Sequence, residues 1–154
     1  MRSGSLDVTR VSVGRSPDGR LRASITMAQA WSPRDLLGRD GAPPGSICLR
    51  VWLGNHRPSS TPPDDLVCMT VAADNDRLKA SVQRERPNDL PERVADATAT
   101  KPTARTATLR FAQSALGRPA SFRFGIEARK GGCRRLDCLD TAPDAPRSGR
   151  VSLR

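Results

Sequence analysis

The chain is poor in the residues on which many binding and catalytic sites depend. Its 154 residues include no tyrosine, three phenylalanines, two tryptophans and one histidine. With aromatic residues at 3%, few rings are available to stack against a sugar. The single histidine, His56, leaves little scope for a Ser/His/Asp site or a zinc site. No window of about 18 residues is apolar throughout, so we expect no transmembrane helix.

Lysine is also scarce, although the chain is strongly basic. Only three of the 26 basic residues are lysines, and the net charge is +10. The arginines are spread singly from Arg2 to Arg154, which favours a solvated basic surface and makes nucleic-acid binding an unexpected function. A polyanion site that uses Arg50, Arg110 and Arg123 remains an alternative, and steep salt dependence would identify it.

Proline and glycine, in contrast, are abundant. The 13 prolines and 12 glycines fit short strands joined by turns and argue against long helices. About nine strands are expected, too many for one open sheet of this size. We therefore predict an all-β fold, a two-sheet antiparallel β-sandwich of immunoglobulin-like or jelly-roll-like type. Residues 1–5 are expected to be a disordered tail or a vector-derived remnant, and residues 6–154 a single domain.

Two alternating segments, Ile47–Leu53 and Leu66–Val71, are expected to be neighbouring antiparallel strands. If Cys48 lies opposite Cys68, both side chains point to the outward face of the sheet. The distance between their Cβ atoms then suits a disulfide. The loop 54–63, with its prolines, would form the tip of this hairpin. In the loop-entropy model a bridge that closes about 20 residues contributes roughly 3 kcal/mol.

The other strands are expected where apolar and polar residues alternate. They are 6–13, with a bulge at Thr9–Arg10; 21–27; 78–82; 94–98, at a sheet edge; 107–111; 122–128; and 151–153. A hairpin turn is expected at 16–19, one helical turn at 113–117, and irregular connections at 28–46 and 131–146.

Four cysteines in a small chain indicate disulfides if the compartment is oxidising. We predict the pairs Cys48–Cys68 and Cys133–Cys138, because each is local and the first follows from strand register. Zinc binding and free thiols are the alternatives, and the wide gap between Cys48 and Cys68 does not fit a zinc knuckle. No apolar run follows Met1–Ser5, so a signal peptide is not visible.

Several segments resemble a group of exported actinobacterial β-sandwich domains. They are Leu6–Val13, Cys48–Trp52, Leu109–Phe124 and Asp140–Asp144. The resemblance implies a short turn at Ser114–Gly117 between two late strands, and a closing strand after Asp144. The group is largely uncharacterised, some members accompany secreted hydrolases, and a signal peptide usually precedes the domain. The resemblance therefore implies a fold and a secreted or cell-surface location more than a chemistry.

Catalysis and metal binding are not expected. His56 is close in sequence to Ser59, Ser60, Asp64 and Asp65, but such neighbours usually reflect the polarity of a loop, so His56→Ala should alter no hydrolase activity. Two oxygen-rich segments, 74–76 and 137–144, lack the twelve-residue pattern of a calcium loop. Their Asp and Asn residues are expected to cap turns, so no cofactor is predicted.

Binding is the function that remains. Trp31 and Trp52 are the two candidate rings for a glycan, although Trp52 shares a strand face with Cys48 and is expected to pack there. We expect a monomeric, secreted, non-catalytic binding or structural module. Its partner would be a cell-wall polymer or another secreted protein. The alternative is a polyanion or carbohydrate module that uses surface arginines or the two tryptophans.

The disulfide pairing can be tested directly. A peptide map of the non-reduced protein should show Cys48 linked to Cys68 and Cys133 linked to Cys138. A peptide that joins Cys48 to Cys133 would contradict the pairing.

Overall fold

The computed structural model describes residues 6–38, 41, 43–58, 60–72, 76–132, 139–142 and 149–153. These residues form an all-β structure with two short 3-10 turns, η1 and η2. The strands are β1 (Val8–Arg15), β2 (Leu21–Met27), β3 (Ser46–Trp52), β4 (Asp65–Val71), β5 (Leu78–Arg84), β6 (Glu92–Thr100), β7 (Thr106–Phe111), β8 (Ser121–Arg129), β9 (Leu139–Ala142) and β10 (Gly149–Ser152). The turns are η1 (Pro33–Leu36) and η2 (Gln113–Leu116).

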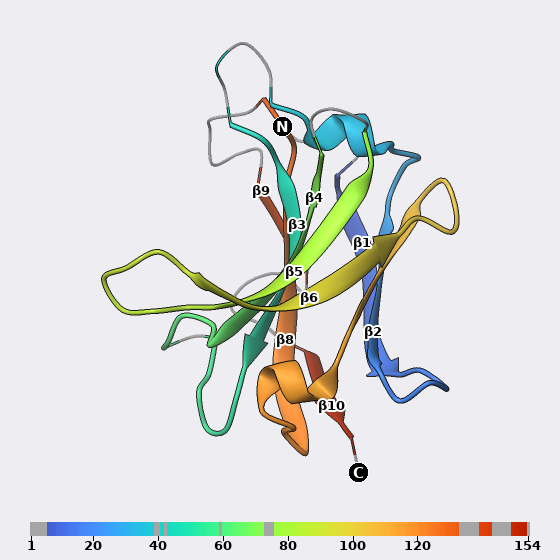
Figure 1. Cartoon of the computed structure of the whole chain (residues 1–154). Helices are drawn as coiled ribbons and strands as arrows, with labels where there is room; N and C mark the ends of the chain where they lie inside the picture. Colours follow the sequence, from blue (N-terminus) through green and yellow to red (C-terminus); the bar gives the residue numbers. More distant parts are fainter. Residues whose placement is uncertain are drawn as a thin grey trace.

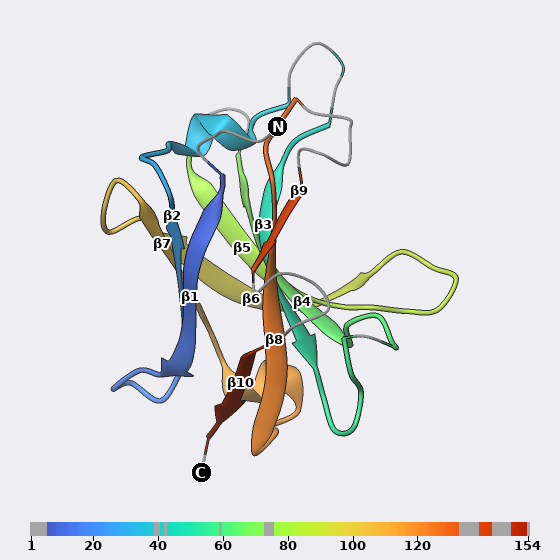
Figure 2. The same cartoon turned by 180° about the vertical axis from the view of Figure 1, so that it is seen from behind.

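The strands form one antiparallel, nearly closed sheet that resembles a barrel (Figures 1 and 2). Its order is β1-β2-β7-β6-β5-β4-β3-β8-β10, and β9 pairs with the same edge of β8 as β10 does. The prediction of an all-β antiparallel fold is confirmed. The strands do not separate clearly into the two sheets that we predicted, and the described residues form ten strands where about nine were expected in the chain.

Strand β6 explains why the sheet is continuous. Its residues 92–97 pair with β5, whereas Thr98–Thr100 pair with β7. The strand therefore passes from one part of the sheet into the next and turns the corner of the barrel. The prediction of an edge strand at 94–98 is wrong, because both sides of β6 are paired along different parts of its length.

The two ends of the sheet meet between β1 and the β9–β10 edge, where side chains make the link. The backbone N–H of Val8 donates to Asp140 Oδ2 at 2.7 Å. At the other end of β1, Arg15 Nη2 donates to the carbonyl oxygen of Leu153 at 2.9 Å. These two bonds hold β1 against the last strands of the chain, and within the described residues no ladder of backbone hydrogen bonds joins β1 to β9 or β10.

The core follows the alternation read from the sequence. All four apolar residues of β2 are at most 1% exposed (Leu21, Ala23, Ile25 and Met27). The inward residues of β3, β4, β7 and β8 are at most 7% exposed. The predicted bulge is present between Val8 and Arg10, and the turn at 16–19 has Gly19 at φ +85°. A positive φ favours glycine because it has no Cβ.

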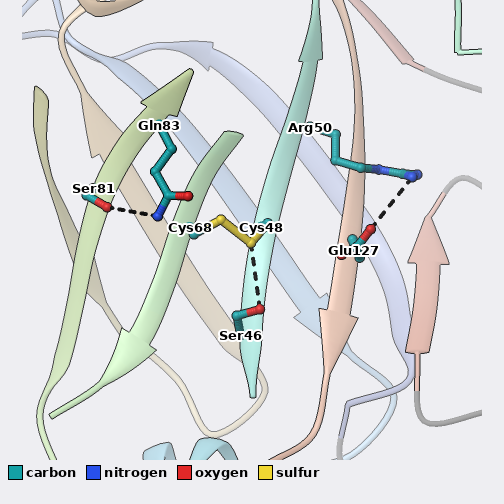
Figure 3. Close-up of a disulfide and its surroundings, with 7 residues drawn as sticks. All are labelled: Ser46, Cys48, Arg50, Cys68, Ser81, Gln83 and Glu127. Carbon is teal, nitrogen blue, oxygen red and sulfur yellow. Dashed lines mark hydrogen bonds and ion pairs between the residues drawn. A yellow bond between two sulfur atoms is a disulfide. The ribbon is translucent and has the colours of Figure 1, made fainter. Parts of the chain in front are cut away.

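The register of β3 and β4 is the predicted one. Cys48 lies opposite Cys68 and the two form a disulfide, with a Cα–Cα distance of 4.0 Å (Figure 3). Arg50 lies opposite Leu66, as the same register requires. Cys133 and Cys138 lie outside the described residues, as do residues 1–5, so those predictions stay open.

Part of the expected C-terminal loop is a strand. Residues Leu139–Ala142 form β9 along β8, which the sequence pattern did not indicate. The segment is short, and all four residues are half-buried, so it carries no alternation of apolar and polar residues. The helical turn expected at 113–117 is confirmed by η2, which ends at Gly117 with φ +80°.

The connection before β3 packs closely on the end of the sheet. The N–H of Gly45 donates to the carbonyl of Leu36 at 2.9 Å, and the N–H of Gly131 donates to that of Asp35 at 2.7 Å. Both glycines let backbone approach backbone. A Cβ on Gly45 would stand 2.7 Å from the carbonyl carbon of Lys130, which is nearer than such atoms can come.

We therefore expect Gly45→Ala to lower the free energy of unfolding by about 1–3 kcal/mol, the usual cost of overpacking. Gly14→Ala is the matched control, because a Cβ at Gly14 meets no atom within 4 Å. Urea unfolding of both variants measures the difference. Equal stability of the two variants would contradict the close approach.

Candidate ligand pocket at one end of the barrel

The two tryptophans predicted as ligand platforms are both buried. Trp31 is 5% exposed, and its indole N–H donates to the carbonyl of Arg105 at 3.2 Å. Trp52 is 3% exposed, and its indole N–H donates to the carbonyl of Thr61 at 3.0 Å. Because both rings pack inside and both polar tips are satisfied, neither offers a free face to a glycan.

The three predicted arginines do not form one surface. Arg50 lies over the Trp52 ring at 5.3 Å and within 3.9 Å of Glu127 on β8 (Figure 3). Burial lowers the pKa of Arg50 below that of a free arginine, and Glu127 opposes this shift. Arg123 lies on β8 next to β3, whereas Arg110 lies on β7, and in the sheet order β6, β5, β4 and β3 separate β7 from β8.

The described residues do contain a pocket that sequence reasoning missed. It has a volume of about 710 Å³ and lies between the β3–β4 loop, the start of the β5–β6 hairpin and the end of η2. In Figure 1 the green β3–β4 loop lies at the lower left, the olive β5–β6 loop at the left, and the orange turn η2 at the bottom centre. The lining residues are Leu53, His56, Thr61–Asp65, Arg84–Pro87, Leu116 and Gly117.

His56 and Asp64 form an oriented pair at the rim of this pocket. His56 Nδ1 lies 2.8 and 2.9 Å from the two oxygens of the Asp64 carboxylate. Asp64 Oδ2 also accepts the backbone N–H of Leu53 at 2.7 Å. The carboxylate therefore fixes both the imidazole and the base of the β3–β4 loop.

Asp65 is a carboxylate at a core position. It has the inward parity of Val67 and Met69 on β4 and is 1% exposed. Its Oδ1 accepts from Arg84 Nε at 3.3 Å. Its Oδ2 is buried, and no group in the described part of the chain donates to it. Burial raises the pKa of Asp65, Arg84 opposes that shift, and Asp64 adds to it.

The rest of the lining is apolar or already paired. Leu53, Pro62, Pro63, Pro87 and Leu116 supply the apolar wall. Arg86 lies 3.4 Å from the carboxylate of Asp89, and its Nε donates to the carbonyl of Leu90 at 3.2 Å. The pocket thus joins an apolar wall to a few fixed polar groups, a combination typical of small-molecule sites.

Among the described lining residues, no free hydroxyl or thiol stands beside the oriented imidazole, as a catalytic triad requires. The hydroxyl of Thr61, the one hydroxyl among the lining residues, donates to the carbonyl of Arg57 at 3.0 Å. Within the described residues no three His, Cys, Asp or Glu side chains gather as a metal site would require. Of the expected oxygen-rich segments, residues 74, 75, 137 and 144 lie outside the described part. No described helix is long and apolar enough to cross a membrane.

One signal in the sequence could have indicated the pocket. Asp65 continues the inward parity of Val67, Met69 and Val71, and a carboxylate on a buried face requires a partner. The contributions of Arg84, Arg86 and Leu116 come from distant parts of the chain, and no local pattern indicates them.

Comparisons with known proteins add no family. No protein-family model matches the chain, and no curated protein matches it. One solved structure is similar over 97% of this chain and 87% of its own, with 8% sequence identity and a TM-score of 0.40. It is a Bacteroides uniformis protein described as a "putative carbohydrate-binding protein". A likeness this distant carries no argument about function.

The buried carboxyl predicts an unusual pH dependence. The pKa of Asp65 in the folded state is raised above 3.8, its value in the unfolded chain. At a pH between these two pKa values, the Asp65 carboxyl is therefore mostly protonated in the folded protein and mostly ionised in the unfolded chain. The contribution of Asp65 to stability is therefore greatest below 3.8 and falls as pH rises through the raised pKa.

Asp65→Asn should remove that component of the pH dependence and leave the rest of the curve unchanged. Asp96→Asn is the matched control, because the Asp96 side chain is 88% exposed on β6, which β5 separates from β4. The measurement is the free energy of unfolding in urea from about pH 4 to neutral. Parallel curves for wild type and Asp65→Asn would show that Asp65 is not the cause.

Proposed function

We propose that the protein is a non-catalytic binding module of an oxidising compartment outside the cytoplasm, and that the barrel-end pocket is its ligand site. The observation that carries the proposal is the pocket itself. A volume of about 710 Å³ suits a small molecule or the end of a polymer. Its polar side chains come from two segments, residues 56–65 and 84–86, and the end of η2 adds Leu116 to the apolar wall.

Binding is favoured over catalysis by the inventory of the pocket. The imidazole of His56 is held by Asp64, but no nucleophile in the described lining lies beside it. The buried Asp65 is engaged by Arg84. These groups are placed to hold a ligand and lack the partners needed to transform one.

The disulfide supports the location. Disulfides persist in oxidising compartments and are rare in the cytosol. The Cys48–Cys68 bridge therefore fits a secreted or cell-surface protein, as does the resemblance to exported actinobacterial domains. A cell-wall polymer or another secreted protein would then be available as the partner.

Polyanion binding is a second candidate, and one observation favours it. Arg123 lies directly opposite Arg150 across β8 and β10, and Arg110 lies directly opposite Arg22 across β7 and β2. Like charges in such positions repel, and an anion between them would relieve the repulsion. Each pair is a separate patch on the outer face of the sheet.

A pull-down on purified cell walls and on immobilised polyanions, at low and high salt, separates the two candidates. Pro62→Trp should abolish salt-resistant binding, because Pro62 is an exposed residue of the pocket and the larger side chain fills it. Pro91→Trp, at an exposed proline outside the lining, is the control.

Polyanion binding should instead fall steeply with salt and be lost in the Arg110→Ala, Arg123→Ala double variant. That result, with the Pro62→Trp protein binding normally, would support the second candidate and reject the pocket. If neither support retains the oxidised protein, both candidates are rejected for these polymers.

A further inference from the structure

We infer that the pocket binds an uncharged, polyhydroxylated ligand, the end of a neutral glycan, and that the Asp65 carboxyl accepts a hydrogen bond from a hydroxyl group of that ligand. This inference rests on the proposed function, because it specifies the ligand of the same pocket. It differs from the carbohydrate site expected from the sequence, because it does not use Trp31 or Trp52.

The charges of the pocket argue against an anionic ligand. Each cationic or titratable base in the lining is already next to a carboxylate: Arg84 beside Asp65, Arg86 beside Asp89, and His56 beside Asp64. Glu85 adds a further acidic residue. An anion would have to displace one of these partners, although the protein as a whole carries a net charge of +10.

Asp65 supplies an acceptor that needs a donor. Its Oδ2 has no hydrogen-bond partner in the described part of the chain, although buried polar atoms almost always have one. An ionised carboxylate only accepts hydrogen bonds, and a guanidinium only donates them. A hydroxyl group does both, so a ligand hydroxyl can donate to Asp65 Oδ2 and accept from an N–H of Arg84, while Asp65 Oδ1 keeps its bond to Arg84 Nε.

The backbone around the pocket argues against a peptide ligand. Four backbone N–H groups of the lining are bonded within the protein: Asp64 to Val51, His56 to Leu53, Glu85 to Asp64, and Gly117 to Ser114. A fifth, that of Leu53, donates to Asp64. Peptides that bind by strand addition need free backbone partners along an edge. Recognition here must come from side chains.

The apolar wall fits the carbon face of a sugar ring. Pro62 and Pro63 expose C–H groups without an aromatic ring, and Leu116, whose side chain is buried, also lines the pocket. Such a wall removes apolar surface of a pyranose from water while the carboxylate and guanidinium contact its hydroxyls. The pocket thus offers both surfaces that a neutral sugar presents.

The test is isothermal titration of the oxidised protein with a panel of neutral oligosaccharides (glucan, mannan, galactan, xylan and N-acetylglucosamine oligomers), a matched panel of uronic-acid oligosaccharides, and unstructured peptides. We expect a neutral oligosaccharide to bind with an affinity that salt does not change. Asp65→Asn should weaken it roughly tenfold or more, since hydrogen bonds to charged groups are the stronger ones. Asp96→Asn should leave it unchanged.

Amide chemical shifts of each variant establish that it is folded. If Asp65→Asn does not fold, Arg84→Gln serves in its place, because it removes the guanidinium and leaves the carboxylate. Pro62→Trp should block binding of whichever ligand uses the pocket.

The outcomes separate the inference from the proposed function. Binding of a uronic acid or a peptide that Pro62→Trp blocks would support the pocket and overturn the ligand class. Neutral-sugar binding that Asp65→Asn leaves intact would overturn the role of Asp65. Binding that Pro62→Trp does not affect would reject the pocket itself. If no neutral oligosaccharide binds, the inference fails.

Discussion

The register between β3 and β4, which the Cys48–Cys68 disulfide holds in place, sets which side chains of the two strands enter the core. Successive residues of a strand point to opposite faces, so a slip of one residue would move each side chain to the wrong side. The observed register buries Ile47, Leu49 and Val67 together. It also places the cysteines on the outer face, where their Cα atoms are 4.0 Å apart.

The pocket follows from the same register. Asp65 is opposite Val51 on one side and Arg84 on the other. Its inward parity carries a carboxylate into the end of the barrel, where the apolar core stops. Asp64, one residue earlier, closes the β3–β4 loop through the N–H of Leu53 and holds His56. A polar cluster therefore forms at the first inward position of β4, where Asp65 precedes the apolar inward residues Val67, Met69 and Val71.

The aromatic residues are used for packing. Trp31 and Trp52 each close one irregular segment against the barrel, through a ring that is buried and an indole N–H that bonds a backbone carbonyl. Cations lie over both rings, Lys101 at 5.1 Å from the Trp31 centroid and Arg50 at 5.3 Å from that of Trp52. Neither tryptophan ring is therefore free to form a recognition surface in the described part of the protein.

The sequence by itself determined the strands with clear alternation, the bulge at Val8–Arg10, the glycine turns and the Cys48–Cys68 register. Each of these depends on residues that are neighbours along the chain or across one hairpin. Tertiary structure alone decided that β6 joins both parts of the sheet, that β9 is a strand, and that Arg84, Leu116 and Asp65 meet in one pocket. These features depend on contacts between segments far apart in sequence. Local alternation indicates a strand and its buried face, but it does not indicate which distant segment will lie beside that strand.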